Sequence, residues 1–154
     1  MAKDRTRRHT LTGFPDAALH LLLAFEEDRQ QIASDHGFSA IELKGLFRIA
    51  SAGSLTPKQL AEQLSVTNGA ITGISTRLVA AGLLHRVAHP NDRRSLYLEL
   101  TDAGHLSMAA IHADFNKMVG DATTGITVDE LDVTVETLRR VTVALRARLR
   151  RDLD

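Results

Sequence analysis

Two adjacent arginines, Arg93 and Arg94, stand in a short polar segment of the chain, residues 89–95. A guanidinium group binds phosphate oxygens well, because it is always charged and presents its N–H donors in a fixed planar fork. Apolar and polar residues alternate on both sides of this segment, over residues 84–89 and 96–100. The alternation predicts two strands joined by a basic loop, with both arginines at its tip. The alternative is an ordinary solvated turn, in which the arginines contact only water.

Two helical patterns come immediately before this hairpin. Residues 57–64 and 68–81 each have apolar residues at helical spacing, and residues 65–67 form a short turn between them. Such a pair of helices presents the N-terminal part of its second helix outward. A helix fits the major groove of B-DNA, and a hairpin beside it carries its loop to the neighbouring minor groove or to the phosphates. The order helix, turn, helix, strand, basic loop, strand therefore favours contact with double-stranded DNA.

The second helix of this pair is poor in charge. Arg77 is its one basic residue, while Asn68 and Thr72 can form hydrogen bonds with base edges. Gly69 and Gly73 lie four residues apart on one face, although each glycine costs a helix about 1 kcal/mol relative to alanine. Two explanations stay open: close approach to DNA, or close packing against another helix. The residues predicted to contact DNA are Thr67, Asn68, Gly69, Thr72, Gly73, Arg77, Asn91, Arg93 and Arg94.

Helix-capping residues divide the rest of the chain into helices. The matches to a capping box, or to an N-cap before proline, are Ser39/Glu42, Thr127/Glu130 and Thr56/Pro57. Gly37 and Gly82 fit left-handed C-caps. The predicted helices span about residues 15–34, 39–50, 57–64, 68–81, 101–120 and 127–151, and residues 51–54 end the second of them. The sequence therefore predicts helices around a single hairpin.

The first and last of these helices lie outside the helix-turn-helix and hairpin, and both have apolar faces. In the last helix, leucine and valine repeat at the heptad-like spacing of a coiled coil. Helices outside a complete small domain need a partner for such faces, although packing on their own domain would leave a similar stripe. A two-fold dimer also combines two half-sites into a full DNA site. The residues predicted at the dimer interface are Leu19, Leu22, Leu131, Val135, Leu138, Leu145 and Leu149.

Charge on the last helix is segregated along its length. Residues 127–138 contain acidic and no basic side chains, whereas residues 139–151 contain arginines and no acid. Each end complements the helix dipole, so helix stability alone explains the pattern. The alternatives are a basic end that lies beside DNA, or one that lies against the acidic first helix of a partner.

The predicted fold is mainly α, an α+β winged helix-turn-helix with flanking N- and C-terminal dimerisation helices. Residues 37–120 form the DNA-binding region with a long connecting helix, and residues 13–36 and 121–154 supply the dimerisation helices. Residues 1–12 are expected to form a flexible basic tail, or alternatively an arm that touches the phosphate backbone.

Composition limits the classes of protein that remain. The chain has 154 residues, with 19 lysines and arginines against 19 acidic residues, and no cysteine. The length fits one domain, and the absence of cysteine excludes disulfides, thiolate zinc sites and thiol chemistry. Zero net charge speaks against a DNA-binding protein, but residues 57–100 hold five basic and three acidic side chains, a net charge of +2. No apolar run is long enough for a secretory signal or a membrane span, so we expect a cytoplasmic protein with no membrane partner.

Several segments resemble the multiple-antibiotic-resistance regulator (MarR) family. The most specific are the Asn-Asp-Arg-Arg-Ser run at residues 91–95 and the Leu-Thr-x-x-Gly pattern at residues 100–104, and residues 55–64 and 82–86 also match. The resemblance implies a homodimeric winged-helix repressor or activator whose DNA affinity is often altered by a small ligand.

The resemblance also assigns roles to individual segments. It matches residues 70–72 to the recognition helix and Arg93 and Arg94 to the wing, but many members have arginine or serine where this chain has Gly73. It implies a ligand pocket near the hairpin. This pocket would lie between the first two helices and the start of the long helix over residues 101–120. The residues predicted to line it are His20, Phe47, His105 and His112.

We therefore expect a sequence-specific, ligand-responsive transcriptional repressor that binds a pseudo-palindromic operator as a homodimer, without a cofactor. A metal-responsive sensor is a weaker hypothesis, because no histidine pair on a predicted helix has the i, i+4 ligand spacing, and we expect no metal site. No phosphate-binding glycine loop, nucleophile elbow or paired-carboxylate motif is present, so we do not expect an enzyme. The other alternative is a winged-helix module that binds protein and not DNA, which the low charge of the recognition helix leaves open.

Overall fold

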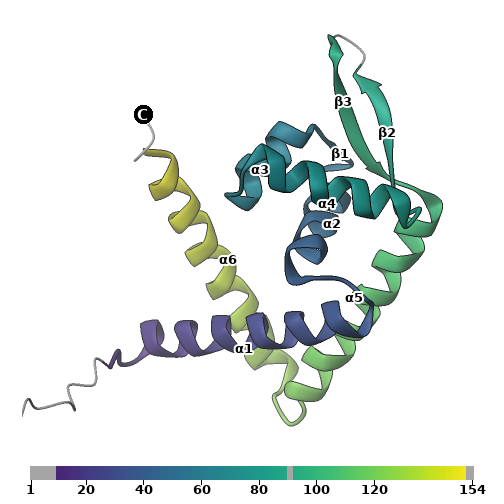
Figure 1. Cartoon of the computed structure of the whole chain (residues 1–154). Helices are drawn as coiled ribbons and strands as arrows, with labels where there is room; N and C mark the ends of the chain where they lie inside the picture. The colour runs from purple at the N-terminus through teal and green to yellow at the C-terminus, as the bar shows by residue number, and fades with distance from the viewer. Residues whose placement is uncertain (1–9, 90–91, 152–154) are drawn as a thin grey trace, which may run out of the picture. The chain divides into compact units, whose positions relative to one another are not determined.

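The computed structural model describes the backbone of residues 10–89 and 92–151, and the side chains of residues 10–88 and 96–149. The chain divides into two compact units, Met1–Phe115 and Asn116–Asp154. The elements (Figure 1) are α1 (Phe14–Asp35), α2 (Ala40–Ala52), β1 (Ser54–Leu55), α3 (Pro57–Leu64), α4 (Asn68–Ala80), β2 (Leu84–His89), β3 (Asp92–Leu100), α5 (Asp102–Ala122) and α6 (Val128–Arg151). Helix α5 continues from the first unit into the second.

The helices begin where local capping chemistry predicts. At α2, the Ser39 hydroxyl accepts a hydrogen bond from the Glu42 backbone N–H at 3.4 Å, and the Glu42 carboxylate accepts one from the Ser39 N–H at 2.9 Å. Thr127 and Glu130 form the same reciprocal box at the start of α6. Thr56 caps α3 in a further box. Each box satisfies N–H groups that a helix end would otherwise leave unpaired, so the predicted capping boxes are confirmed.

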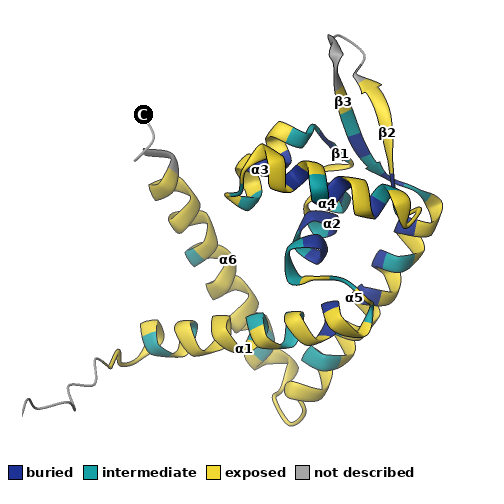
Figure 2. Cartoon of the chain, in the orientation of Figure 1, coloured by how far each residue is buried: buried dark blue, intermediate teal, exposed yellow. Residues whose placement is uncertain are grey.

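One apolar core holds the first unit together. It lies among α2, α3, α4, the sheet and the middle of α5, and the C-terminal end of α1 joins it through Ile32 and Ala33. Figure 2 shows the buried residues gathered on these elements. Burial of each large side chain contributes about 1.5–3 kcal/mol to folding. Those that are fully buried are Leu43, Leu46, Ile49, Leu60, Ile71, Leu84, Leu98 and Ile111.

The sheet has three antiparallel strands in the order β1-β3-β2. Strand β1, at which the sequence predicts only the end of a helix, pairs Leu55 with Leu98 of β3. In the hairpin, Leu84 at the start of β2 pairs with Leu100 at the end of β3. Figure 1 shows this hairpin projecting from α2, α3 and α4.

The hairpin strands are longer than predicted. Strand β3 begins at Asp92, which pairs with His89, so Arg93 and Arg94 are strand residues and not loop residues. The prediction of a loop over residues 89–95 was therefore wrong. The register shifts between Ala88, which pairs with Leu96, and His89, which pairs with Asp92, so residues 93–95 of β3 lie at an irregularity in the ladder that the alternation of apolar residues does not reveal.

Gly104 fixes the start of α5 against the sheet. A Cβ atom on Gly104 would overlap the carbonyl oxygen of Leu83. The same carbonyl accepts the Thr101 N–H at 3.0 Å, and the Thr101 hydroxyl oxygen accepts the Gly104 N–H at 3.0 Å. Only a glycine at position 104 lets the first turn of α5 approach the Leu83 carbonyl so closely. This contact is the physical reason for the Leu-Thr-x-x-Gly pattern.

Helix α6, in the second unit, leaves most of its apolar side chains exposed. Of the predicted interface residues on α6, Leu131 is half-buried and the other four are exposed. None of the described helices is long and apolar enough to cross a membrane. The exposed large apolar residues of α6 are Val128, Val133, Val135, Leu138, Val143, Leu145 and Leu149, and those of the first half of α1 are Phe14, Leu19, Leu21, Leu22 and Leu23.

Candidate DNA-binding surface and ligand pocket

Helix α4 has one buried face and one exposed face. Ile71, Ile74 and Leu78 are buried in the core. Asn68 and Thr72, which the sequence predicts as base-contacting residues, are exposed. In the turn between α3 and α4, Ser65 ends α3 in a left-handed conformation with φ of 54°.

The N-terminal turn of α4 is capped by Thr67, whose hydroxyl oxygen accepts the Ala70 N–H at 3.2 Å. The Thr72 hydroxyl donates to the Asn68 carbonyl at 3.0 Å, which leaves its oxygen lone pairs and its methyl group for other contacts. A capped helix N-terminus with exposed short polar side chains suits both phosphate and base-edge contacts.

Among the described residues, Gly69 and Gly73 have no packing neighbour from another element. A Cβ atom on Gly69 would meet only the Thr67 hydroxyl at 3.9 Å, and one on Gly73 would meet only the Arg77 guanidinium at 3.6 Å. Both contacts come from α4 itself or its cap. Of the two explanations for these glycines, close packing against another described helix of the same chain is therefore wrong.

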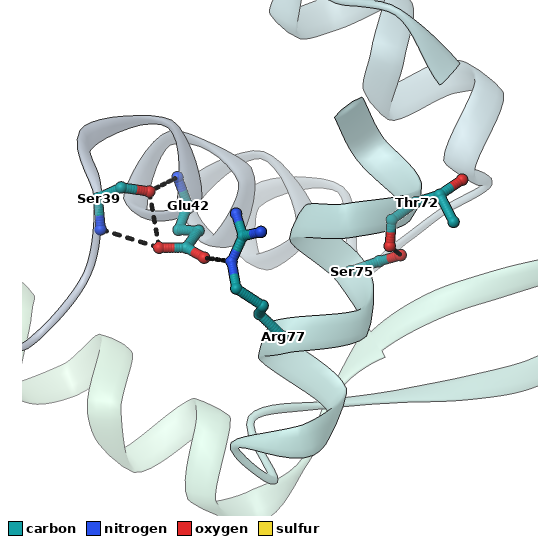
Figure 3. A network of polar contacts seen from close by, with 5 residues as sticks. All are labelled: Ser39, Glu42, Thr72, Ser75 and Arg77. Atoms are coloured by element: carbon teal, nitrogen blue, oxygen red, sulfur yellow. Dashed lines mark hydrogen bonds and ion pairs between the residues drawn. The ribbon is translucent and has the colours of Figure 1, made fainter. Parts of the chain in front are cut away.

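Arg77 lies in the last turn of α4 and pairs with Glu42 of α2. Its Nε donates to the Glu42 carboxylate at 2.6 Å, as Figure 3 shows. The other carboxylate oxygen accepts from the Ser39 hydroxyl at 2.6 Å and from the Ser39 N–H. Burial alone would raise the pKa of Glu42, but the hydrogen bonds from Ser39 and Arg77, with the positive charge of Arg77, lower it overall. Glu42 is therefore a charged carboxylate at neutral pH.

The hairpin adds positive charge beside α4. Arg86 of β2 donates to the Thr76 hydroxyl of α4 at 3.2 Å, which ties the strand to the exposed face of the helix. Of the predicted wing residues, Asn91 lies outside the described residues, and the side chains of Arg93 and Arg94 do as well. The backbone of β3 places both of those arginines near the hairpin turn. Sequence reasoning did not select Arg86 as a site residue, although its position on a predicted strand beside the recognition helix was a usable signal.

A pocket of about 770 Å³ opens among α1, α2, α3 and α5, within the first unit. Its apolar lining includes Phe25, Leu43, Phe47 and Phe115, and the rings of Phe25 and Phe115 pack in a tilted arrangement with centroids 5.7 Å apart. An apolar pocket with a few polar groups at its rim is the usual form of a small-molecule site.

Basic side chains also line this pocket. Arg29 and Lys44 approach the same Glu26 carboxylate oxygen, at 3.0 Å and 3.6 Å. The Nε of Arg29 is buried and has no hydrogen-bond partner among the described residues. Arg48 lines the pocket as well. With three basic groups against one carboxylate, the lining has a net positive charge.

Two of the four predicted pocket residues line this pocket. Phe47 and His112 meet there, with ring centroids 5.3 Å apart. His20 instead bonds to the Asp16 carbonyl on α1, and His105 is exposed nearer the start of α5; neither lines the pocket. This pocket lies beside the middle of α5, through Ile111, His112 and Phe115, and not at the start of α5 near the hairpin, where the resemblance places a ligand pocket. The described residues contain no group of three or more metal-binding side chains.

A three-helix body with an outward recognition helix and a basic hairpin defines a winged helix-turn-helix protein of the DNA-binding class. The MarR family model matches residues 38–96. The multiple antibiotic resistance protein MarR of Escherichia coli (strain K12) is 34% identical over 108 residues, which cover 67% of this chain and 72% of that protein. The chain belongs to the MarR family.

Structures and other relatives agree with this assignment. A crystal structure of a mutant form of Escherichia coli MarR superposes with a TM-score of 0.71 at 26% identity, covering 87% of this chain and 99% of that one. A transcriptional repressor of Bacillus subtilis, MdtR, is 26% identical over 119 residues, covering 75% of this chain and 77% of that protein. The fold is shared with NadR in complex with 4-hydroxyphenylacetate, with a TM-score of 0.66 at 20% identity, covering 88% of this chain and 96% of that one. The chain is a DNA-binding transcriptional regulator and not an enzyme.

Proposed function

We propose that the protein is a ligand-responsive repressor that binds a pseudo-palindromic operator as a homodimer in the cytoplasm. The observation that carries the proposal is the exposed polar face of α4 beside a basic hairpin. In this arrangement Thr67, Asn68 and Thr72 contact the major groove, and Arg93 and Arg94 contact phosphates or the minor groove. The repressor role is supported by the name of the relative MdtR.

The homodimer is supported by the apolar residues that one chain leaves exposed on α1 and α6. Exposed apolar stretches of this extent mark interaction surfaces. In a two-fold dimer, α1 and α6 pack on the same helices of the second copy, through the predicted residues Leu19, Leu22 and Leu138 among others. Two recognition helices then meet successive major grooves about 34–36 Å apart.

The ligand response is assigned to the pocket between α1, α2, α3 and α5. Its aromatic lining suits the ring of a small molecule, and its basic rim suits an anionic group, as the buried unpaired Nε of Arg29 favours. NadR, which shares the fold, was solved with the aromatic acid 4-hydroxyphenylacetate, and this compound is a suitable first probe.

The roles of the two DNA-contacting elements are tested by one pair of variants. Arg94→Ala removes a phosphate-type contact, so it is expected to weaken binding to the operator and to mixed-sequence duplexes alike, by about tenfold, and to flatten the salt dependence. Thr72→Val keeps the shape of the side chain but removes its hydroxyl, and it is expected to relax sequence preference with little change on mixed-sequence duplexes. Affinities are measured by fluorescence anisotropy at several salt concentrations.

Unchanged affinity of the Arg94→Ala dimer would refute the wing assignment. Uniform weakening by Thr72→Val would refute base recognition at that position.

A further inference from the structure

We propose that Glu42 is a positioning residue for DNA binding: its carboxylate, anchored at the start of α2, holds the Arg77 guanidinium where it contacts a DNA phosphate beside the recognition helix. The inference rests on the proposed function and adds a residue that lies outside the predicted DNA contacts. Its basis is the network that joins Ser39, Glu42 and Arg77 across α2 and α4 (Figure 3).

Glu42 carries a charge in a buried position, which is unusual for a carboxylate. The residue is only 9% exposed, and it is the one charged residue among the buried residues that the structure describes. Burial of a carboxylate is costly unless its oxygens are paired. Both oxygens are paired here: Ser39 donates to one from its N–H and its hydroxyl, and Arg77 donates to the other. The carboxylate is thus fixed by the helix cap, and the guanidinium is fixed by the carboxylate.

Arg77 itself remains available to a ligand. Only its Nε is bound to Glu42, and its side chain is 62% exposed. Its two Nη nitrogens have no hydrogen-bond partner in the part of the chain that the structure describes. One of them, Nη1, lies 3.6 Å from the position of a Cβ atom on Gly73, so the guanidinium extends back along α4 toward its exposed face. Because its Nε is held by Glu42 and its Nη nitrogens are unpaired among the described residues, the guanidinium can donate two hydrogen bonds to a phosphate.

The position of the Arg77 side chain matters because the recognition helix α4 has little other charge. Arg77 is the one basic residue of α4, so the phosphate contact of that helix depends on where this side chain is held. A free arginine loses rotamer entropy when it is fixed, and a side chain that is already fixed avoids that loss on binding. Gly73 adds no side chain beside the guanidinium.

The proposal is tested with a double-mutant cycle on a mixed-sequence duplex, because a phosphate contact does not depend on sequence. The variants are Glu42→Gln, Arg77→Gln and the double substitution. Ser39 and Arg77 bond to different oxygens of the carboxylate, and a glutamine amide replaces one of these oxygens with an NH2 group that only donates, so one of the two partners loses its acceptor. Each single variant is expected to weaken binding about tenfold and to reduce the slope of log K against log salt by about 0.9 for each bound protomer. The double variant is expected to bind as Arg77→Gln does, because the effect of Glu42 passes through Arg77.

Two controls separate positioning from other effects. Glu62→Gln removes an exposed negative charge from α3 of the same unit and is expected to leave the slope unchanged. Thr56→Ala removes the capping hydrogen bond at the start of α3 and leaves Ser39, Glu42 and Arg77 unaltered, so it is expected to lower the thermal unfolding temperature without changing the slope.

The outcomes distinguish this inference from the proposed function. Tighter binding by Glu42→Gln would show that the carboxylate neutralises Arg77, and would overturn the inference. Additive losses in the double variant, or an unchanged slope for Glu42→Gln, would overturn it too, while salt-dependent binding by the wild-type chain would still support the proposed function. If the wild-type chain binds the duplex without salt dependence, the proposed function and the inference both fail.

Discussion

The body of the first unit and the helix α6 differ in where their leucines lie. Leu46 of α2 is 1% exposed, whereas Leu145 of α6 is 55% exposed. The same residue type therefore completes a core within one chain in the first case and remains uncovered in the second. The winged-helix body encloses its own apolar core. The terminal helices carry apolar surface that the described chain leaves uncovered, and that contrast is the basis for proposing DNA recognition by one region and dimerisation by the other.

The largest expected difference comes from the same substitution in both regions. Leu46→Ala leaves a cavity in a closed core, so it is expected to lower the free energy of unfolding by about 2–5 kcal/mol at any protein concentration. Leu145→Ala is expected to leave the body intact and to weaken the dimer by about tenfold or more, since each substitution counts twice in a two-fold interface. Chemical denaturation and sedimentation velocity over a range of concentrations measure the two effects.

The result that breaks this comparison is a concentration-independent loss of stability for Leu145→Ala, with no change in dimer affinity. Leu145 would then pack within its own chain. An unaltered dimer together with unaltered stability would remove this position from any interface.

A smaller contrast is expected between two glycines of the same helix. Gly104→Ala places a methyl group on the Leu83 carbonyl, so it is expected to lower the free energy of unfolding by about 2–3 kcal/mol. Gly120 has nothing within 4 Å of its Cβ position. Gly120→Ala is therefore expected to raise stability by about 0.5–1 kcal/mol, through helix propensity alone.

Urea denaturation followed by circular dichroism checks both glycine variants. A stable Gly104→Ala protein would mean that α5 can shift away from the sheet. A destabilised Gly120→Ala protein would mean that this surface of α5 is covered in the dimer, which would sharpen the comparison by extending the interface.

Features that depend on local chemistry were predictable from the sequence. The capping box of Ser39 and Glu42 and that of Thr127 and Glu130 fixed two helix starts, because each involves residues three positions apart. The left-handed glycines Gly37 and Gly82 were also predictable, since a helix end requires positive φ there. The helix-turn-helix and hairpin followed from the change in apolar period.

Features that depend on distant neighbours were not predictable. Strand β1 is two residues long and forms only because Leu98 of β3 lies beside Leu55. The pairing of Glu42 with Arg77 joins residues 35 positions apart, and neither residue type by itself indicates it. The basic pocket lining was missed for the same reason, because Arg29 and Lys44 meet only after α1 packs on α2.

The central claim is that two copies of this chain read a two-fold DNA site. Selection of bound sequences from a random duplex library, with the full chain, tests it most directly. We predict enrichment of an inverted repeat whose half-sites lie about 10–10.5 base pairs apart, bound by two protomers per duplex. Recovery of unenriched sequences, or of a single half-site bound by one protomer, would contradict it.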